Sequence, residues 1–533
     1  MKSSIEAAIR NVAAFGDTDI FPYSFEQHIF RDRPELLQRA LEEIHKDFDN
    51  QLAQNPPHNI TTLTPVSFTG FRWGTQIDPM WNAYYLALVI EMGDDIERAR
   101  IPVKDKTVFS YRFTTPTPKG HIFNDKVNWH AFMKTCLKAP KRFQYVIVCD
   151  IADFYSRVYH HKIENALERL KAKPDVVKRI VKLLQSFSGA VSYGLPVGGP
   201  ASRILAELAL NNVDKLLRGE GIRFCRFVDD YRIFCASKEE AYEQLISLSD
   251  KLFNEGLSLQ KHKTRVLTMK EFTDEVHLLL RTHQVDEEAL SEEDKLLRLS
   301  IPFDPYSETR VDDYDRLKKE VSQVDIAGIL TRELEKTRID PAVTKKAISA
   351  LRVVEPAPQK RILSSLLQHE NLQSLAPAFP RFMIVLRGLY TELDEETQGL
   401  IDSALIKLVQ KESFIIKLDL NLCYLLQVMR RRGSQKKEEL FVRLFKENSN
   451  PLIRREIILG MTEWGCNWWL ADLKKMFNGL SKWERRCFIV ASYFLTDEGK
   501  HWRNHNKSVF DLSEFVVRDW FADRFQTNAA VPQ

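Results

Sequence analysis

One stretch decides how the chain folds, and it reads Ile222-Arg-Phe-Cys-Arg-Phe-Val-Asp229-Asp230-Tyr-Arg-Ile-Phe-Cys235. Two apolar runs, rich in residue types that favour strands, flank a pair of adjacent aspartates. A short polar break between two such runs predicts a β-hairpin with the acids at its tip. Adjacent carboxylates raise each other's pKa unless a cation neutralises them, and divalent cations prefer oxygen ligands. Two aspartates at a turn are also typical of a solvated turn, so the pair alone does not identify a metal site.

A third carboxylate follows another apolar run. The run Phe143–Cys149 predicts a buried strand, and Asp150 comes directly after it, 79 residues before Asp229. Acids at strand ends suit a pair of metal ions about 3.5–4 Å apart, which activate an attacking hydroxyl and stabilise the leaving oxygen. Nucleotidyl transfer needs little else from a protein beyond positioning and charge. The three acids therefore predict a metal-dependent nucleotidyl transfer site.

Composition sets the limits within which this hypothesis must fit. The chain has 533 residues, of which 44% are hydrophobic and 28% charged, enough for two or three domains. Its formal net charge of +4 is compatible with nucleic acid binding but is no evidence for it. The seven cysteines form no Cys-x-x-Cys pair, which indicates a reducing cytosol and neither a disulfide framework nor a zinc site. We expect no signal peptide, and no apolar run approaches the ~20 residues of a membrane span.

The order of patterns over residues 141–270 is typical of one known arrangement. A strand ends at Asp150, and helical spacing predicts helices over about 160–184 and 201–218. The aspartate hairpin follows, then a helix over about 239–254 and a closing strand that reaches Leu267. Strand, helix, hairpin, helix and strand in this order predict a split βαβ sheet. Before it, Val108–Phe113 also has the composition of a strand.

Three linked motifs carry a resemblance to a known family. They are Asp150-x4-Tyr155, then Tyr193-Gly194-Leu195-Pro196-Val197-Gly198-Gly199, then Phe227-Val-Asp229-Asp230. Their order and spacing resemble motifs A, B and C of reverse transcriptases. The strings Phe-Ser-Tyr-Arg-Phe, Asp-Ile-Ala-Asp-Phe-Tyr and Val-Tyr-His-His, with a long helical C-terminal part, are similar to bacterial abortive-infection (Abi) reverse transcriptases. The resemblance to the prophage-borne Abi polymerases of temperate coliphages is close.

The resemblance implies roles for individual residues. Asp150, Asp229 and the carbonyl of Ile151 would hold Mg²⁺, or Mn²⁺ in its place, and Asp230 would act electrostatically. Tyr155 stands where a ring under the sugar excludes a 2′-hydroxyl, and Lys263 stands where a lysine donates a proton to the departing pyrophosphate. The remaining candidate nucleotide-binding residues are Arg112, Gly194, Pro196 and Gly198.

The same resemblance implies a fold and a domain order. It predicts an α+β protein, with reverse-transcriptase-like fingers and palm followed by an all-α domain of HEAT-like helical repeats. Helical patterns of about 15 residues recur after residue 336, which is consistent with a helical repeat. The expected segments are N-terminal helices and fingers over 1–140, palm over 141–270, a linker or thumb-like helices over 271–335 and the helical domain over 336–533.

The Abi family makes DNA without a template, primed from a protein hydroxyl, and assembles into homo-oligomers that defend bacteria against phage. By this resemblance we expect deoxynucleoside triphosphates as substrates, a DNA product that can be attached to protein, a bacterial cytoplasmic location and no membrane partner. Val197 stands where templated reverse transcriptases usually carry Gln, which argues against ordinary template reading. The priming hydroxyl is not identified; Tyr23 is one candidate, and a packed aromatic residue is the alternative. A templated polymerase and a non-catalytic nucleic-acid-binding scaffold remain alternative functions.

Overall fold

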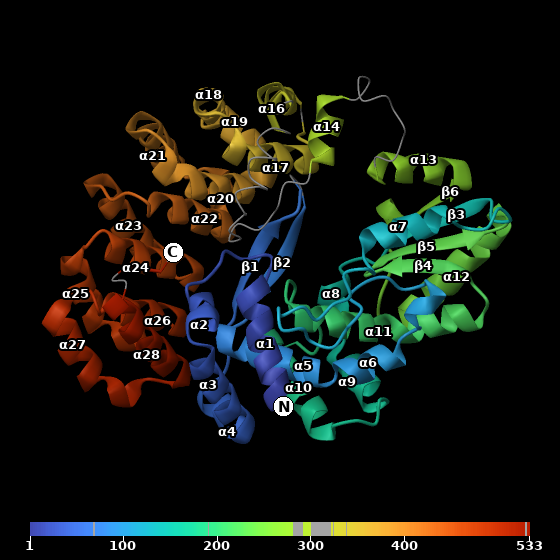
Figure 1. The fold of residues 1–533 in the computed structure, drawn as a ribbon, viewed down its shortest axis with the longest axis horizontal. Helices are drawn as coiled ribbons and strands as arrows, with labels where there is room; N and C mark the ends of the chain where they lie inside the picture. The colour runs from blue at the N-terminus through green and yellow to red at the C-terminus, as the bar shows by residue number, and fades with distance from the viewer. Residues whose placement is uncertain are drawn as a thin grey trace. The chain divides into compact units, whose positions relative to one another are not determined.

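The computed structural model describes residues 1–67, 70–189, 191–280, 291–299, 321–322, 324–336, 338–527 and 530–532 (Figure 1). The chain folds as two compact units. The first comprises Met1–Asn59 and Thr75–His283, and the second comprises Ile60–Gly74 and Gln284–Gln533. A short internal segment therefore belongs to the same unit as the C-terminal half of the chain. The predicted boundaries at residues 140, 270 and 335 stay a prediction.

The first unit begins with helices α1 to α6, and one of them, α5, is buried. They are α1 (Lys2–Phe15), α2 (Glu26–Asp32), α3 (Pro34–Lys46), α4 (Phe48–Gln54), α5 (Pro79–Glu91) and α6 (Gly93–Ala99). Every residue of α5 from Pro79 to Ile90 is buried, because α1, α10 (Pro174–Ser188) and α11 (Pro200–Gly219) pack around it. A helix that is apolar on all sides requires such an environment.

The palm sheet of the first unit has four antiparallel strands in the order β4-β5-β3-β6. Helix α12 packs on β3 and β5, while α7 and α13 supply the side chains that cover the other face. On that face, the side chains of Val146 and Val148 belong to a hydrophobic cluster that includes Phe132 and Phe234, as the alternation of side chains along a strand requires. The elements are β3 (Tyr145–Asp150), β4 (Phe224–Phe227), β5 (Asp230–Cys235), β6 (Arg265–Thr268), α7 (Trp129–Leu137), α8 (Phe154–Arg157), α9 (His160–Glu168), α12 (Lys238–Asn254) and α13 (Met269–Leu280).

The palm elements appear in the predicted order, with two local differences. The helix expected over about 160–184 is divided into α9 and α10, because Lys173 is left-handed and Pro174 starts a new helix. The segment Val108–Phe113 is not a regular strand. It forms single bridges, from Val108 to Arg226 and from Phe113 to Phe123, because Tyr111 has a φ of 42° and turns the chain between them.

The second unit combines a two-stranded sheet with an array of helices. The sheet pairs β1 (Ile60–Pro65) with β2 (Phe71–Gln76), and β1 packs against α22 (Asp419–Met429). In the array α20, α22, α24, α26 and α28 each pack on the next member of that row. The other helices are α14 (Glu292–Arg298), α16 (Ile326–Glu335), α17 (Pro341–Ala350), α18 (Pro356–Leu366), α19 (His369–Ser374), α20 (Phe379–Leu389), α21 (Glu395–Gln410), α23 (Gln435–Glu447), α24 (Pro451–Glu463), α25 (Asn467–Lys475), α26 (Lys482–Ala491), α27 (Thr496–His505) and α28 (Leu512–Thr527).

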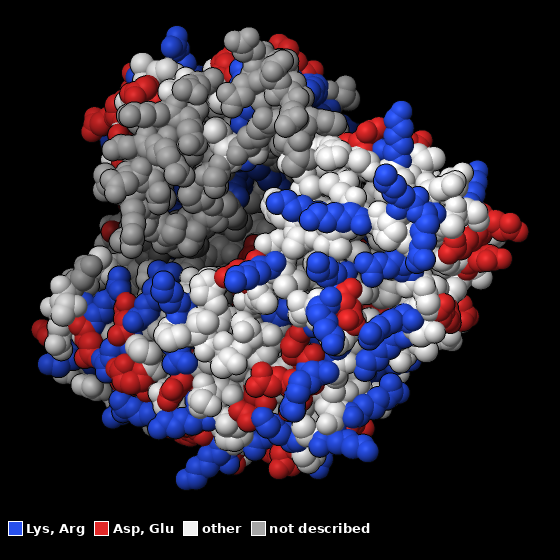
Figure 2. All heavy atoms as spheres, turned by 45° about the vertical axis from the view of Figure 1, so that its right-hand side comes forward, with Lys and Arg blue, Asp and Glu red and all other residues white. Residues whose placement is uncertain are grey.

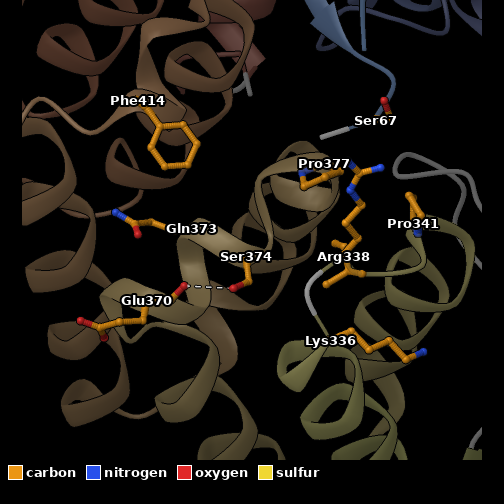
Figure 3. Close-up of a pocket in the computed structure, with 10 residues that line it drawn as sticks. Ser67, Lys336, Arg338, Pro341, Glu370, Gln373, Ser374, Pro377 and Phe414 are labelled. Carbon is orange, nitrogen blue, oxygen red and sulfur yellow. Dashed lines mark hydrogen bonds between the residues drawn. The ribbon is translucent and has the colours of Figure 1, made fainter. Parts of the chain in front are cut away.

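The array is all-helical, as expected for the C-terminal part of the chain, while its HEAT-like character stays a prediction. A surface pocket of about 500 Å³ opens in this unit, between Ser67 of the hairpin and residues around α16 to α20 (Figure 3). Across its floor the Ser374 hydroxyl donates a hydrogen bond to the Glu370 carbonyl over 3.3 Å. Among the described residues, none of the helices is both long and apolar enough to cross a membrane.

Candidate active site

The three predicted acids lie together at one end of the palm sheet. Asp150 ends β3 and Asp230 begins β5, and the two residues face each other in the strand register. Asp229 occupies the turn between β4 and β5, and its carbonyl accepts a hydrogen bond from the Ile151 N–H over 3.2 Å. Strand pairing therefore fixes the backbone positions of the three aspartates. The structure brings together the acids that lie 79 residues apart in the sequence.

The electrostatics of this cluster favour a bound cation. Burial, followed by the charges of Asp150 and Asp230, raises the pKa of Asp229 from 3.8 to about 6. Two basic side chains already contact Asp150 and Asp230. Lys263 Nζ lies 2.8 Å from Asp150 Oδ2, and Arg232 Nη1 lies 3.2 Å from Asp230 Oδ1. Burial and the two neighbouring carboxylates thus disfavour ionised Asp229 in the protein alone, and a bound cation would offset both effects.

The residues at this cluster fit a magnesium site that substrate completes. In the parts of the chain that the structure describes, no three His, Cys, Asp or Glu side chains form a metal-binding group by themselves. Mg²⁺ is commonly held by one or two carboxylates together with water and substrate phosphates, so a smaller protein donor set is sufficient. Asp150, Asp229 and the Ile151 carbonyl would supply an all-oxygen set of that kind.

Tyr155 and Lys263 both lie next to these acids. Tyr155 is on α8, directly after the strand that ends at Asp150, and its carbonyl accepts the Leu195 N–H over 2.8 Å. Burial and the neighbouring Tyr111 raise the pKa of Tyr155 well above its usual value, so the ring is a neutral phenol. The hydrogen bond to Asp150 raises the pKa of Lys263, which keeps its ammonium group protonated.

The glycines of the loop 194–199 serve different purposes. Gly194 has a φ of 99°, and its N–H donates to the Val158 carbonyl over 2.8 Å, so a turn requires it. Gly198 has a φ of 114°, and a Cβ there would collide with Thr18 Oγ1 and lie 3.2 Å from Asp19 Oδ1. The chain's own N-terminal segment therefore fills the space beside Gly198, where we expected a nucleotide. Pro196, in the same loop, is partly exposed.

Two other candidates, Arg112 and Tyr23, have buried side chains. Arg112 is only 2% exposed, forms an ion pair with Glu97 and donates to the Ile101 carbonyl over 3.0 Å. Burial and the nearby Arg100 lower the pKa of Arg112 to about 10. Arg112 Nη2 is thus engaged by Glu97 and Ile101, and the contact of Arg112 with a nucleotide stays a prediction.

Tyr23 is a packed aromatic residue, as the alternative interpretation proposed. The side chain is 8% exposed, and its ring centroid lies 5.5 Å from that of His28. The Arg31 guanidinium lies 5.3 Å from the Tyr23 ring centroid on the other side. A hydroxyl on such a residue is not presented to solvent as a primer should be.

Sequence reasoning missed one cation near the site. Arg203, in the first turn of α11, lies over the Tyr111 ring at 5.2 Å and binds Asp19 Oδ2 at 2.5 Å. Its charge acts to lower the pKa of Tyr155, which shows that the two side chains are close. The signal was available, since Arg203 follows Gly199-Pro200 at a helix start, where anions bind favourably.

Sequence reasoning also missed a buried ionic cluster beneath the acids. Four of its side chains are at most 5% exposed and come from three segments of the chain, and Ser110 joins them through its hydroxyl. The four charged members are Arg100, Glu207, Asp214 and Arg226. The spacing of Glu207 and Asp214, seven residues apart on one helix face, was the available signal.

Basic side chains are plentiful on the surface of the palm elements. Figure 2 shows Lys and Arg side chains spread over the face that it presents, with Asp and Glu between them. Such a surface is compatible with a phosphate backbone. The exposed basic residues of α7, of β6 and of the segments beside them are Lys134, Lys138, Lys141, Arg142, Lys261, Lys263, Arg265 and Lys270.

Comparisons with curated proteins and with solved structures add little to this geometry. No curated protein matches the chain. Similar solved structures include telomerase of Candida tropicalis with a TWJ fragment of telomeric RNA (11% identity, 73% of this chain, 68% of that chain, TM-score 0.29) and telomerase of Candida albicans with such a fragment (9%, 68%, 70%, 0.29). Apo telomerase of Candida tropicalis is a third (11%, 67%, 73%, 0.27). TM-scores this low carry no argument about fold or function.

The family comparison is informative. Residues 97–295 match the model of the reverse transcriptase (RNA-dependent DNA polymerase) family. The matched range includes all three acids, Tyr155 and Lys263, whose arrangement at the end of the palm sheet is described above. The chain thus contains a reverse transcriptase domain and is a nucleotidyltransferase of the reverse transcriptase and DNA polymerase type.

Proposed function

We propose that this chain is a DNA polymerase that adds deoxynucleotides without a template, starting from a protein hydroxyl, and that it acts in abortive-infection defence of bacteria against phage. One observation carries the polymerase chemistry, namely that Asp150, Asp229 and Asp230 lie at adjoining ends of β3 and β5. The priming and defence parts rest on the resemblance to Abi polymerases. We further propose a bacterial cytoplasmic homo-oligomer, with HEAT-like packing in the helical array.

The residues around the acids have distinct tasks in this reaction. Mg²⁺ held by Asp150, Asp229 and the Ile151 carbonyl would activate the attacking hydroxyl and neutralise phosphate charge. Lys263 holds a proton at Nζ, 2.8 Å from Asp150 Oδ2, where it can be donated to the departing pyrophosphate. The Tyr155 ring excludes a sugar that carries a 2′-hydroxyl.

Two features of the loop 194–199 support synthesis without a template. Val197 provides no amide with which to read a base. In addition, the segment Asp17–Ile20 lies against Gly198 and Gly199, and a Cβ on Gly199 would be 3.4 Å from the Asp17 carbonyl oxygen. Asn82 Nδ2 donates to that carbonyl over 3.1 Å and fixes the segment in place. A nucleic acid strand at this loop would therefore have to displace the segment Asp17–Ile20.

Incubation of the purified protein with each labelled deoxynucleotide and Mg²⁺, without nucleic acid, tests the proposal. We expect label that stays with the protein on a denaturing gel, and its loss in the Asp229→Asn variant, whose side chain has nearly the same shape. A product that forms only with added template and primer would overturn template independence and leave the polymerase chemistry intact. Absence of incorporation under both conditions, by protein with a cooperative melting transition, would overturn the polymerase proposal.

The defence role needs a separate test in cells. We expect bacteria that express the wild-type chain to show fewer phage plaques than bacteria that express Asp229→Asn at the same protein level. Full protection by Asp229→Asn would contradict the proposal and favour a binding scaffold instead.

A further inference from the structure

The residue before the key acid has an unusual backbone conformation. Val228 has a φ of 58°, in the left-handed region. A β-branched residue rarely adopts this conformation, because its side chain is crowded against the backbone. Such a conformation persists only when the surroundings impose it. Since Asp229 follows directly, the direction of its carboxylate depends on what holds Val228.

Two hydrogen bonds hold the two peptide groups that flank Val228. On one side, Ser110 Oγ accepts the Val228 N–H over 2.8 Å. On the other side, Arg226 Nη1 donates to the Val228 carbonyl over 2.6 Å. Both bonds are buried. Together they restrain rotation on both sides of the Val228 Cα atom.

The guanidinium of Arg226 is fully used in this arrangement. It is 0% exposed, and its N–H groups have partners in Asp214, Glu207 and the Val228 carbonyl. Only the planar five-donor fork of arginine can satisfy these acceptors at once, since a lysine has three donors at one point. The carbonyl of Val228 is the acceptor that links this cluster to the active-site turn.

Ser110 is tied to the same cluster. Its hydroxyl donates to Glu207 Oε1 over 2.5 Å while it accepts the Val228 N–H. Arg100 Nη2 binds Glu207 Oε2 at 2.6 Å and also donates to the Ser110 carbonyl over 2.8 Å. Two buried cations thus balance two buried anions. Buried ion clusters are weak evidence for stability, so positioning is a better explanation for this one.

We infer that Ser110 and Arg226 are positioning residues that hold Val228 in its left-handed conformation and so direct the Asp229 carboxylate toward Asp150. This inference rests on the proposed role of Asp229 in metal binding. Without the two hydrogen bonds Val228 would relax to an ordinary conformation, and the Asp229 side chain would turn with it.

Metal dependence separates positioning from a purely structural role. For Ser110→Ala and Arg226→Lys we expect Mg²⁺ to raise the melting temperature less than it does for the wild type. We also expect a higher Mg²⁺ concentration at half-maximal incorporation and a rate about tenfold to a hundredfold lower, as small misplacements of reacting groups cause. The matched control is Asn211→Ala, which removes a different, partly buried hydrogen bond from α11, to the Ala99 carbonyl over 3.0 Å. That variant should change the melting temperature alone.

A second substitution provides a rescue. Glycine adopts a positive φ without strain, so Val228→Gly should return part of the lost rate and Mg²⁺ affinity to Ser110→Ala. If Ser110→Ala and Arg226→Lys both keep the wild-type Mg²⁺ dependence, or if Val228→Gly restores nothing, the inference is wrong. An inactive Asp229→Asn would in that case still support the proposed function. An active Asp229→Asn would overturn the proposed function, and the inference would fall with it.

Discussion

Replacing Asp229 by Asn should stabilise the metal-free protein at neutral pH even though it abolishes nucleotide incorporation. In the folded chain, burial and the charges of Asp150 and Asp230 raise the pKa of Asp229 from 3.8 to about 6. A carboxyl group with a raised pKa binds its proton more tightly in the folded state than in the unfolded state. The stability that this proton contributes is fully present below pH 3.8 and is lost as the pH rises through about 6.

The size of the effect follows from the two pKa values. They differ by about two pH units, and each unit corresponds to about 1.4 kcal/mol, so ionised Asp229 lowers the free energy of unfolding by at most about 3 kcal/mol. Asparagine does not ionise and avoids this loss. For a unit of this size the gain corresponds to a rise of about 5 °C in melting temperature.

Thermal unfolding in EDTA, followed by circular dichroism at pH 7.5 and pH 4, measures the difference. We expect Asp229→Asn to melt above the wild type at pH 7.5 and close to it at pH 4. The control is Asp125→Asn, which changes an acid with a 79% exposed side chain and should leave both temperatures unchanged. Mg²⁺ should raise the melting temperature of the wild type by mass action and have less effect on Asp229→Asn. An equal or lower melting temperature for Asp229→Asn at pH 7.5 would refute the reasoning.

Three further predictions address neighbouring residues. Tyr155→Ala should lower the preference for deoxynucleotides over ribonucleotides by about tenfold to a hundredfold, measured as the ratio of kcat/KM values, and an unchanged ratio would exclude the sugar-selecting role. Lys263→Arg keeps the charge but holds its proton too tightly to donate it, so kcat should fall about a hundredfold with little change in KM, and a wild-type kcat would rule out proton donation. Gly198→Ala should reduce stability by about 1–3 kcal/mol, because of its positive φ and its approach to Thr18, whereas Gly219→Ala, with open space around it, should not; equal melting temperatures for the two variants would contradict this.

The palm could be predicted from the sequence because its signals are local. Apolar runs mark the strands, and Pro200 marks a helix start within one residue of where the structure has it. The acids of the site follow from the same patterns, since each stands at the end of a predicted strand. Local composition was sufficient wherever one element could be recognised without its neighbours.

The remaining features depend on pairing between distant residues, which local patterns do not contain. The sequence predicts a nucleotide contact for Arg112, because its ion pair with Glu97 is recognisable only once the fold brings the two side chains together. Glu207 was overlooked, since an acid on an amphipathic helix usually faces water. The charge of buried Glu207 is compensated by Arg226, which lies on the separate strand β4.

The hairpin Ile60–Gly74 has a consequence for any attempt to divide this protein. Because it packs with α22, a break after His283 would not yield two self-sufficient fragments. The C-terminal piece alone would lack β1, and the face of α22 that β1 covers would be left open to water and to aggregation. During synthesis, the hairpin leaves the ribosome long before its partner helix exists. Shortened versions for expression should therefore keep this segment, by circular permutation or as an added peptide.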